Sequence, residues 1–247
     1  MKIGFFDSGV GGFTVLAQAL KQIPNHEYLY FADSKNAPYG VKSKDEVLKL
    51  TEAAVDFLTN EGAEIIVIAC NTATSAAATH VREKYKIPII GIEPAIKPAL
   101  EIEGRVLVTA TSLTLKEEKF KNLLNGLDTE GLVDTCALDK LVQFAENEIF
   151  DEGIVLPYLV EKMSSLKLSH YGSIVLGCTH FPLFKHSLKK LMPHATLVDG
   201  SIGVVKNLKR FVINSDRDEK IQFYISGIKA SEKEAKLLTH ILNHARS

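Results

Sequence analysis

The chain of 247 residues lacks several features that mark other classes of protein. Its three cysteines are widely spaced and form no CxxC pair, which argues against a disulfide framework, a zinc ribbon and a thioredoxin-like site. Its longest dense apolar run, residues 65–70, is far shorter than a membrane span. Opposite charges nearly cancel, with 29 Lys and Arg against 30 Asp and Glu, whereas a dedicated nucleic-acid binder is usually clearly basic.

The sequence also gives no sign of export. The apolar stretch within residues 1–9 is too short for a signal peptide. A reducing cytoplasm is therefore the expected location. The hydrophobic fraction of 46% and the charged fraction of 24% are ordinary for a globular protein. We therefore expect a cytoplasmic globular protein that binds neither nucleic acid nor a membrane.

Short β-branched runs alternate with amphipathic stretches along the chain. Residues 44–60 predict a helix, because Ser43 and Glu46 are spaced as a capping box and Gly62 is placed to end it. Ile65–Ala69 is continuously apolar, which is typical of a strand buried on both faces of a parallel sheet. The alternation predicts an α/β fold with mainly parallel sheets. Strands are expected at residues 2–6, 28–32, 65–69, 88–92, 105–109, 173–177, 196–199 and 222–226.

Other helices follow from spacing and capping signals. Thr114 and Glu117 are spaced to cap one helix, and Pro182 suits a first helical turn. The stretch 141–167 is expected to be helical, with a break near Gly153 and Pro157. Further helices are expected at residues 11–21, from about residue 72, and after Ser231, which with Glu234 opens the last one.

The chain contains an internal duplication. Residues 65–72 resemble residues 173–180, and each reads as a buried strand, a small residue, a cysteine and then polar residues. We expect two similar α/β domains related by a pseudo-twofold axis, the first made of residues 1–92 and 207–247 and the second of residues 93–206. This arrangement would place Cys70 and Cys178 on opposite walls of one cleft, where the active site is expected.

Cys70 and Cys178 are the main candidates for chemistry. Both follow a predicted parallel strand, and ligands of open α/β sheets bind beyond the carboxyl ends of strands. Both also precede a predicted helix, whose N-terminus is expected to lower a thiol pKa from roughly 8.5. Two opposed thiols could remove a proton from one face of a carbon and deliver one to the other, which inverts a stereocentre. Cys136 reads as an ordinary buried thiol.

Polar residues adjoin these cysteines and the first strand. Asp7 and Ser8 open a glycine-rich turn, where backbone N–H groups can hold an anion. His180 lies two residues after Cys178, and an imidazole beside a thiol commonly activates it. Asn71, Thr72 and Thr179 could equally cap helices. The remaining histidines show no metal-ligand spacing, so no metal is expected.

Four segments together resemble the cofactor-independent glutamate racemases of the aspartate/glutamate racemase superfamily: residues 6–12, 38–40, 69–73 and 177–183. The resemblance covers most of the chain and implies interconversion of L- and D-glutamate without a cofactor. It also implies a supply of D-glutamate for peptidoglycan, hence a role in cell-wall biogenesis and cell shape. Members of the family commonly form homodimers, and we expect one here.

Site roles follow from this resemblance, residue by residue. Cys70 is expected to take the proton from D-glutamate and Cys178 from L-glutamate, while Asp7 and His180 are expected to assist as catalytic residues. Thr111 and Thr114 match a threonine-containing loop that helps to hold the substrate. The full set of expected substrate-binding residues is Asp7, Ser8, Tyr39, Gly40, Asn71, Thr72, Thr111, Thr114, Thr179 and His180.

The sequence departs from the family pattern in places. Glu117 and Phe120 stand where the family usually has Ser and Tyr, and residues 136–142 differ from its usual segment. A downstream glutamate assists catalysis in some members, and both Glu146 and Glu148 are candidates for that place.

Three other functions stay open on the residues alone. A sister racemase acting on aspartate or another amino acid would differ in pocket shape, which the sequence does not show. A binding or regulatory protein could keep the fold without catalysis, although both cysteines are intact. A hydrolase or transferase using a single thiol would form an acyl-thiol intermediate, but it leaves the second cysteine unexplained.

Overall fold

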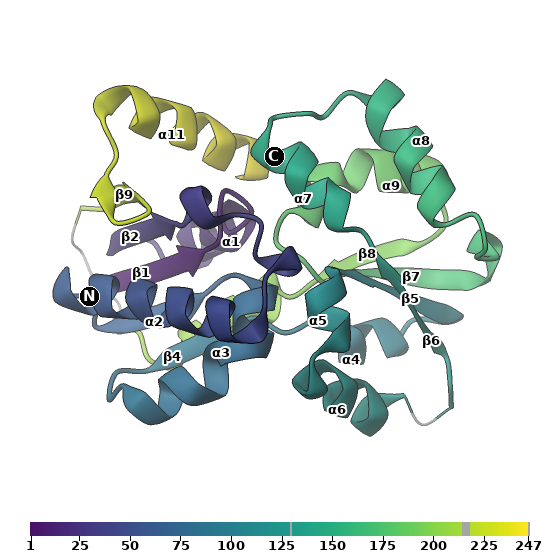
Figure 1. The fold of residues 1–247 in the computed structure, drawn as a ribbon, viewed down its shortest axis with the longest axis horizontal. Coiled ribbons are helices and arrows are strands. Elements are labelled where there is room, and N and C mark those ends of the chain that lie inside the picture. The colour runs from purple at the N-terminus through teal and green to yellow at the C-terminus, as the bar shows by residue number, and fades with distance from the viewer. Residues whose placement is uncertain (129, 214–217, 247) are drawn as a thin grey trace.

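The computed structural model describes residues 1–128, 130–213 and 218–246, which form two α/β units side by side (Figure 1). Each unit is built on its own sheet, and we call the unit with the N-terminal strand the first domain and the other the second domain. The predicted α/β fold with mainly parallel sheets is confirmed.

The first domain has a six-stranded sheet with β1 near its centre. Its pairings are parallel except that of β10 with β9. The chain returns from the second domain to add β9 beside β2. In spatial order the strands are β10 (Ile228–Lys229), β9 (Lys220–Ile225), β2 (Glu27–Ala32), β1 (Lys2–Asp7), β3 (Ile65–Ile68) and β4 (Ile89–Gly91).

The second domain has a four-stranded sheet in which every pairing is parallel. Its central strands β5 and β7 are therefore counterparts of β1 and β3, and their carboxyl ends likewise carry candidate site residues. In spatial order the strands are β6 (Val133–Ala137), β5 (Arg105–Ala110), β7 (Tyr171–Leu176) and β8 (Thr196–Asp199).

Helices cover both faces of each sheet, so the strands are buried on both sides. In β3, Ile65 and Val67 pack with α1, α10 and α11, while Ile66 and Ile68 pack with α2 and α3. This two-sided burial is what the continuous apolar run predicted. The helices are α1 (Phe13–Gln22), α2 (Lys44–Asn60), α3 (Asn71–Lys84), α4 (Ile96–Leu100), α5 (Ser112–Lys116), α6 (Glu118–Leu127), α7 (Asp139–Glu146), α8 (Glu152–Lys162), α9 (Lys185–Leu191), α10 (Ser201–Leu208) and α11 (Glu232–Arg246).

Some local expectations hold and others are wrong. The capping box of Ser43 and Glu46 is present at the start of α2. Thr111, not Thr114, caps the helix after β5, because its side chain accepts from the Thr114 N–H. The break expected near Gly153 and Pro157 is misplaced, because the interruption lies at residues 147–151, between α7 and α8, and both residues lie inside α8.

Several elements were not expected from the sequence, among them α4, β10, β6 and α10. Strand β6 has the mixed sequence VDTCA, which shows no clear alternation, and it forms because its backbone pairs with β5. Helix α10 packs with α1 and β4 in the core of the first domain. The division of the chain at residues 92 and 206 stays a proposal, and the packing of α10 favours a second division point before Ser201. Among the described residues, no helix is long and apolar enough to cross a membrane.

Candidate active site

Cys70 lies at the junction of β3 and α3, where the chain turns from strand to helix. Its sulfur accepts a hydrogen bond from the Ala73 N–H at 3.4 Å and so caps α3. The thiol lies 3.6 Å from Ser8 Oγ, at the end of the neighbouring strand β1. The residue is 4% exposed, so this thiol is held between two strand ends with almost no contact with solvent.

The expectation of a lowered pKa for Cys70 is wrong in this state of the protein. Burial and, to a lesser extent, the nearby Asp7 carboxylate together raise the pKa of the thiol to about 12. The hydrogen bond from Ala73 acts in the opposite direction but does not outweigh them. Cys178 is also close enough to act on Cys70 electrostatically, so the structure brings the two cysteines to one site.

Cys178 follows β7 as Cys70 follows β3, but its neighbours differ. Its sulfur lies 3.6 Å from His180 Nδ1, and the other ring nitrogen, Nε2, lies 2.5 Å from Glu146 Oε1. Cys178 and His180 are both buried, at 6% and 1% exposed. Together they form a thiol–imidazole–carboxylate row, an arrangement in which the carboxylate orients the ring and the ring acts on the thiol.

Two opposing effects act on the His180 imidazole. Burial alone would lower its pKa, because a low-dielectric interior disfavours the charged ring. The hydrogen bonds to Cys178 and Glu146 act against this, and together with the charges of both groups they raise the pKa of His180 well above its usual value. The ring therefore binds its proton more tightly than a free imidazole does, and the Glu146 carboxyl group lies beside it.

Asp7 joins the two halves of the site. Its carboxylate accepts from the Gly9 N–H at 2.9 Å within the glycine-rich turn, and from the Thr179 hydroxyl of the second domain at 2.9 Å. Burial raises the pKa of Asp7, although the nearby His180 charge and the Gly9 N–H lower it. A group held in this balance can change its protonation when a charged ligand binds.

The glycine-rich turn fits closely against the second domain. The Val10 N–H donates to Glu146 Oε1 at 2.9 Å, so one carboxylate oxygen binds both this turn and His180. A Cβ at Gly9 would collide with Glu146, and a Cβ at Gly11 would collide with the His180 ring and the Thr179 hydroxyl. The glycines therefore allow close approach of the two domains, a role that the sequence reading did not assign to them.

Three threonine hydroxyls meet on another edge of the site. Thr72 Oγ1 lies 3.0 Å from Thr111 Oγ1 and 3.3 Å from Thr114 Oγ1, and the last two are 2.9 Å apart. Thr72 lies in the first turn of α3 in the first domain, whereas the other two belong to the start of α5 in the second. Gly40 packs directly on Thr111, since a Cβ there would lie 2.8 Å from the threonine Cβ.

Asn71 and Tyr39 occupy contrasting environments. Among the residues that the structure describes, neither polar side-chain atom of the 3% exposed Asn71 has a hydrogen-bonding partner. Buried amides are normally paired, so a ligand is the natural partner for this one. Tyr39 instead donates its hydroxyl to Asp33 at 2.7 Å. Asp33 and Tyr30 support the site, and the Tyr30 hydroxyl donates to the Gly9 carbonyl. No motif in the sequence points to either residue.

The structure distinguishes between the uncertain glutamates. Glu146 is the one that contacts His180, while Glu148 lies exposed in the next turn with φ +55°. Glu117 is buried and forms an ion pair with Lys44 at 3.0 Å. Phe120 packs in the core beneath β5 with Val106 and Val108. Both residues that depart from the family pattern are therefore buried in the structure.

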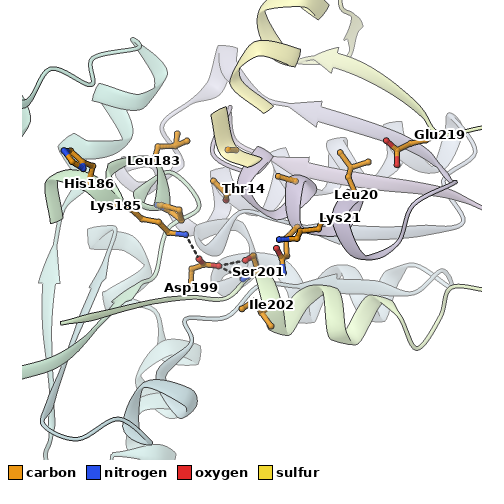
Figure 2. Close-up of a pocket in the computed structure, with 14 residues that line it drawn as sticks. Thr14, Leu20, Lys21, Leu183, Lys185, His186, Asp199, Ser201, Ile202 and Glu219 are labelled. Atoms are coloured by element: carbon orange, nitrogen blue, oxygen red, sulfur yellow. Dashed lines mark hydrogen bonds and ion pairs between the residues drawn. The ribbon is translucent and has the colours of Figure 1, made fainter. Parts of the chain in front are cut away.

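A separate pocket of about 880 Å³ adjoins the site on the side of α1 (Figure 2). Thr14 connects the two, because it lines the pocket and its hydroxyl donates to the Thr179 carbonyl at 3.2 Å. Lys185 and Asp199 pair across its floor at 3.3 Å. Among the described residues lining it, charges of both signs are present, and none is an expected site residue.

The fold and site together define a class of protein. It is a two-domain α/β protein with a buried site between the domains. The site holds two cysteines, each at the carboxyl end of a central strand and each with its own polar neighbours. Within the described residues there is no group of three or more His, Cys, Asp or Glu that could hold a metal ion.

The proteins compared below, which are similar to this chain in sequence or in fold, are racemases. The sequence profile of the Asp/Glu/Hydantoin racemase family matches residues 8–206. A glutamate racemase of Halothermothrix orenii is 47% identical, over 96% of this chain and 98% of that protein. The crystal structure of glutamate racemase from Campylobacter jejuni has a TM-score of 0.86 at 31% identity, with 98% of both chains covered. A glutamate racemase from Francisella tularensis, in complex with D-glutamate, has a TM-score of 0.83 at 26% identity over 98% of this chain and 93% of that one.

The chain belongs to the Asp/Glu/Hydantoin racemase family. It is an isomerase of the racemase class, as the resemblance in the sequence implied.

Gly11→Ala tests the close approach of the domains. The added Cβ would displace His180, and a misplacement of about 1 Å near the reacting groups costs roughly 100-fold in rate. We expect racemase activity to fall by about that factor. Gly126→Ala in α6 is the matched control, because its Cβ meets open space and should leave activity unchanged. Full activity in Gly11→Ala would contradict the argument.

Asn71→Leu tests whether the unpaired amide is reserved for a ligand. Removing a polar group without a partner should leave the melting temperature unchanged or raise it. The KM of the racemase reaction should rise roughly tenfold or more, because a hydrogen bond to a charged ligand is lost. Asn60→Leu at the exposed end of α2 is the control. A clear loss of stability in Asn71→Leu without a change in KM would show a purely structural amide.

Proposed function

We propose that this protein is a glutamate racemase that interconverts L- and D-glutamate by proton transfer between two cysteines. The observation that carries the proposal is the pair of buried thiols, Cys70 and Cys178, at equivalent ends of β3 and β7. Near full-length similarity to glutamate racemases, one of them in complex with D-glutamate, supports glutamate as the substrate.

The proposed reaction needs one thiolate and one thiol. The thiolate removes the α-proton, and the electron pair left on the α-carbon spreads into the adjacent carboxylate. The opposite thiol then gives its proton to the other face of this planar, carbanion-like species. Cys178 takes the proton of L-glutamate and Cys70 that of D-glutamate, so each direction leaves the two sulfurs with exchanged protonation.

The surroundings of the two sulfurs favour one starting state. The raised pKa of Cys70 keeps it a thiol at neutral pH in the ligand-free protein. His180 lies beside Cys178 and is placed to exchange a proton with its sulfur. The ligand-free site is thus prepared to remove a proton from L-glutamate and to return one from Cys70.

Side chains of both domains provide the groups that glutamate needs. Asp7 is placed to receive the ammonium group, whose charge would favour the ionised carboxylate. The three threonine hydroxyls, the Asn71 amide and backbone N–H groups at the start of α3 are donors for carboxylates. Donors fixed by the fold stabilise developing negative charge better than water does, which is the main requirement of α-proton removal without an electron sink.

Proton NMR in D2O tests the function directly. Pure protein is mixed with L-glutamate and, separately, D-glutamate, without added cofactor, and the α-proton signal and optical rotation are followed. We expect the signal and the rotation to be lost from both enantiomers. Failure with glutamate but success with aspartate would assign a sister activity, and failure with both would indicate a scaffold without this chemistry.

Serine variants of the cysteines test the two-base mechanism. Cys70→Ser and Cys178→Ser should each reduce racemisation by about 10²–10⁴-fold, the usual contribution of a general acid or base. Any remaining deuterium exchange should be confined to L-glutamate in Cys70→Ser and to D-glutamate in Cys178→Ser.

Cys136→Ser is the matched control for these variants. Its sulfur lies 3.8 Å from the Lys162 carbonyl, in the second domain and outside the site, so its activity should be that of the parent. Normal racemisation in either site variant would rule out the two-base mechanism. A trapped acyl-thiol intermediate would favour the single-thiol alternative.

The physiological setting is part of the same proposal. We infer a cytoplasmic homodimer that supplies D-glutamate for peptidoglycan, as the similarity to glutamate racemases supports. Light scattering of the pure protein measures its mass against the 27.2 kDa of one chain. A growth requirement for D-glutamate after depletion of the protein would support the cell-wall role, and its absence would contradict it.

A further inference from the structure

One ion pair between the domains lies outside the catalytic constellation. Lys44 Nζ of the first domain lies 3.0 Å from Glu117 Oε2 of the second. The two side chains differ in environment, since Lys44 is 56% exposed and Glu117 only 8% exposed. The pair therefore joins a buried carboxylate of one domain to an exposed amine of the other.

Lys44 does not suit the element to which it belongs. Lys44 is the first residue of α2, where the positive end of the helix dipole disfavours a cation. Glu117 separates α5 from α6, with an extended backbone at φ −64° and ψ 138°. A carboxylate is rarely buried without a partner, and Lys44 is the partner that the structure provides. The contact between domains, rather than local helix stability, accounts for Lys44.

The pair lies next to the part of the site that holds the threonine hydroxyls. Lys44 follows η2 (Tyr39–Val41), which carries Gly40, and Glu117 follows α5, which carries Thr114. Helix α5 packs against both η2 and α3 (Figure 1). Separation of the domains at Lys44 and Glu117 would therefore also separate Thr72 from Thr111 and Thr114.

We propose that Lys44 is a positioning residue, whose ion pair with Glu117 holds the two domains closed over the substrate-binding edge of the site. This role rests on the proposed function, to which it adds a residue that controls closure over the substrate. In the closed state Glu117 is cut off from water and depends on Lys44, whereas in an open state water can solvate it. Loss of Lys44 thus disfavours the closed state without harming either domain.

This reasoning predicts an asymmetry between the partners. Lys44→Met leaves a buried carboxylate without a counter-ion, which is costly. In the double variant Lys44→Met with Glu117→Gln the isolated charge is gone, so closure should be largely restored. Lys44→Arg keeps the charge and should behave like the parent. A residue that merely contributed helix stability would show neither the rescue by Glu117→Gln nor that by arginine.

Alkylation of the cysteines measures closure without any assumption about the reaction. The ligand-free protein is treated with iodoacetamide, and modification of each cysteine is followed by mass spectrometry. Cys70 and Cys178 lie between the domains, whereas Cys136 lies within the second domain and serves as an internal control. Lys44→Met should raise the rates at Cys70 and Cys178 about tenfold and leave Cys136 unchanged.

Lys84→Met is the matched control variant. Lys84 lies 3.1 Å from Glu52, but both residues belong to the first domain, in α3 and α2. Its loss should change none of the three rates. Unchanged rates in Lys44→Met would overturn the proposal, and so would equal acceleration at Cys136, because that indicates general loosening of the fold.

Steady-state kinetics with glutamate complete the test. Lys44→Met should raise KM about tenfold with a smaller change in kcat, and the double variant should return KM towards the parent value. If the parent racemises no glutamate, the proposed function fails while the alkylation result still decides the role of Lys44. If the parent is active and Lys44→Met has normal KM and alkylation rates, only the positioning role fails.

Discussion

The site depends above all on the close contact between the glycine-rich turn after β1 and the segment that follows Cys178. Thr179 donates to Asp7, and Glu146 accepts from Val10 while it pairs with His180. These contacts cross from one domain to the other, so neither domain contains a complete site. The turn can come this close because it has no side chains at the points of contact.

The two domains place their cysteines in the same backbone arrangement but surround them with different side chains. Each places a cysteine where a central parallel strand ends, yet Cys70 has a carboxylate and a hydroxyl as neighbours and Cys178 has an imidazole. The backbone places the two sulfurs at equivalent strand ends, and the neighbouring side chains make their surroundings different.

Local signals in the sequence are sufficient for much of the fold. The apolar run of β3 and the capping box at Ser43 depend on neighbours in the chain, and both are present as expected. Strand β6 and the packing of α10 depend on partners far along the chain, which no local pattern reports. The place of Thr111 as a cap was missed because Thr114 has the same residue type at a similar spacing.

The site shows the same division between local and distant causes. The duplication placed Cys70 and Cys178 correctly at strand ends, but the expected lowering of the Cys70 pKa considered only the start of α3. Burial and the Asp7 charge come from tertiary structure and exceed that local effect. The choice of Glu146 over Glu148 likewise depends on tertiary structure, since Glu146 ends α7 beside His180 whereas Glu148 lies exposed in the following turn.

Several contacts between the domains are hydrogen bonds, although Leu113 of α5 also packs against apolar side chains of the first domain. These hydrogen bonds bear on how substrate enters a buried site. Hydrogen bonds such as that of Thr179 to Asp7 replace bonds to water, so each contributes only about 0.5–1.5 kcal/mol to closure. An apolar interface of the same extent would hold the domains shut much more firmly. Within the part of the chain that the structure describes, the Asn71 amide has no hydrogen-bonding partner. A ligand that satisfies it stabilises the closed state further, so binding and closure reinforce each other.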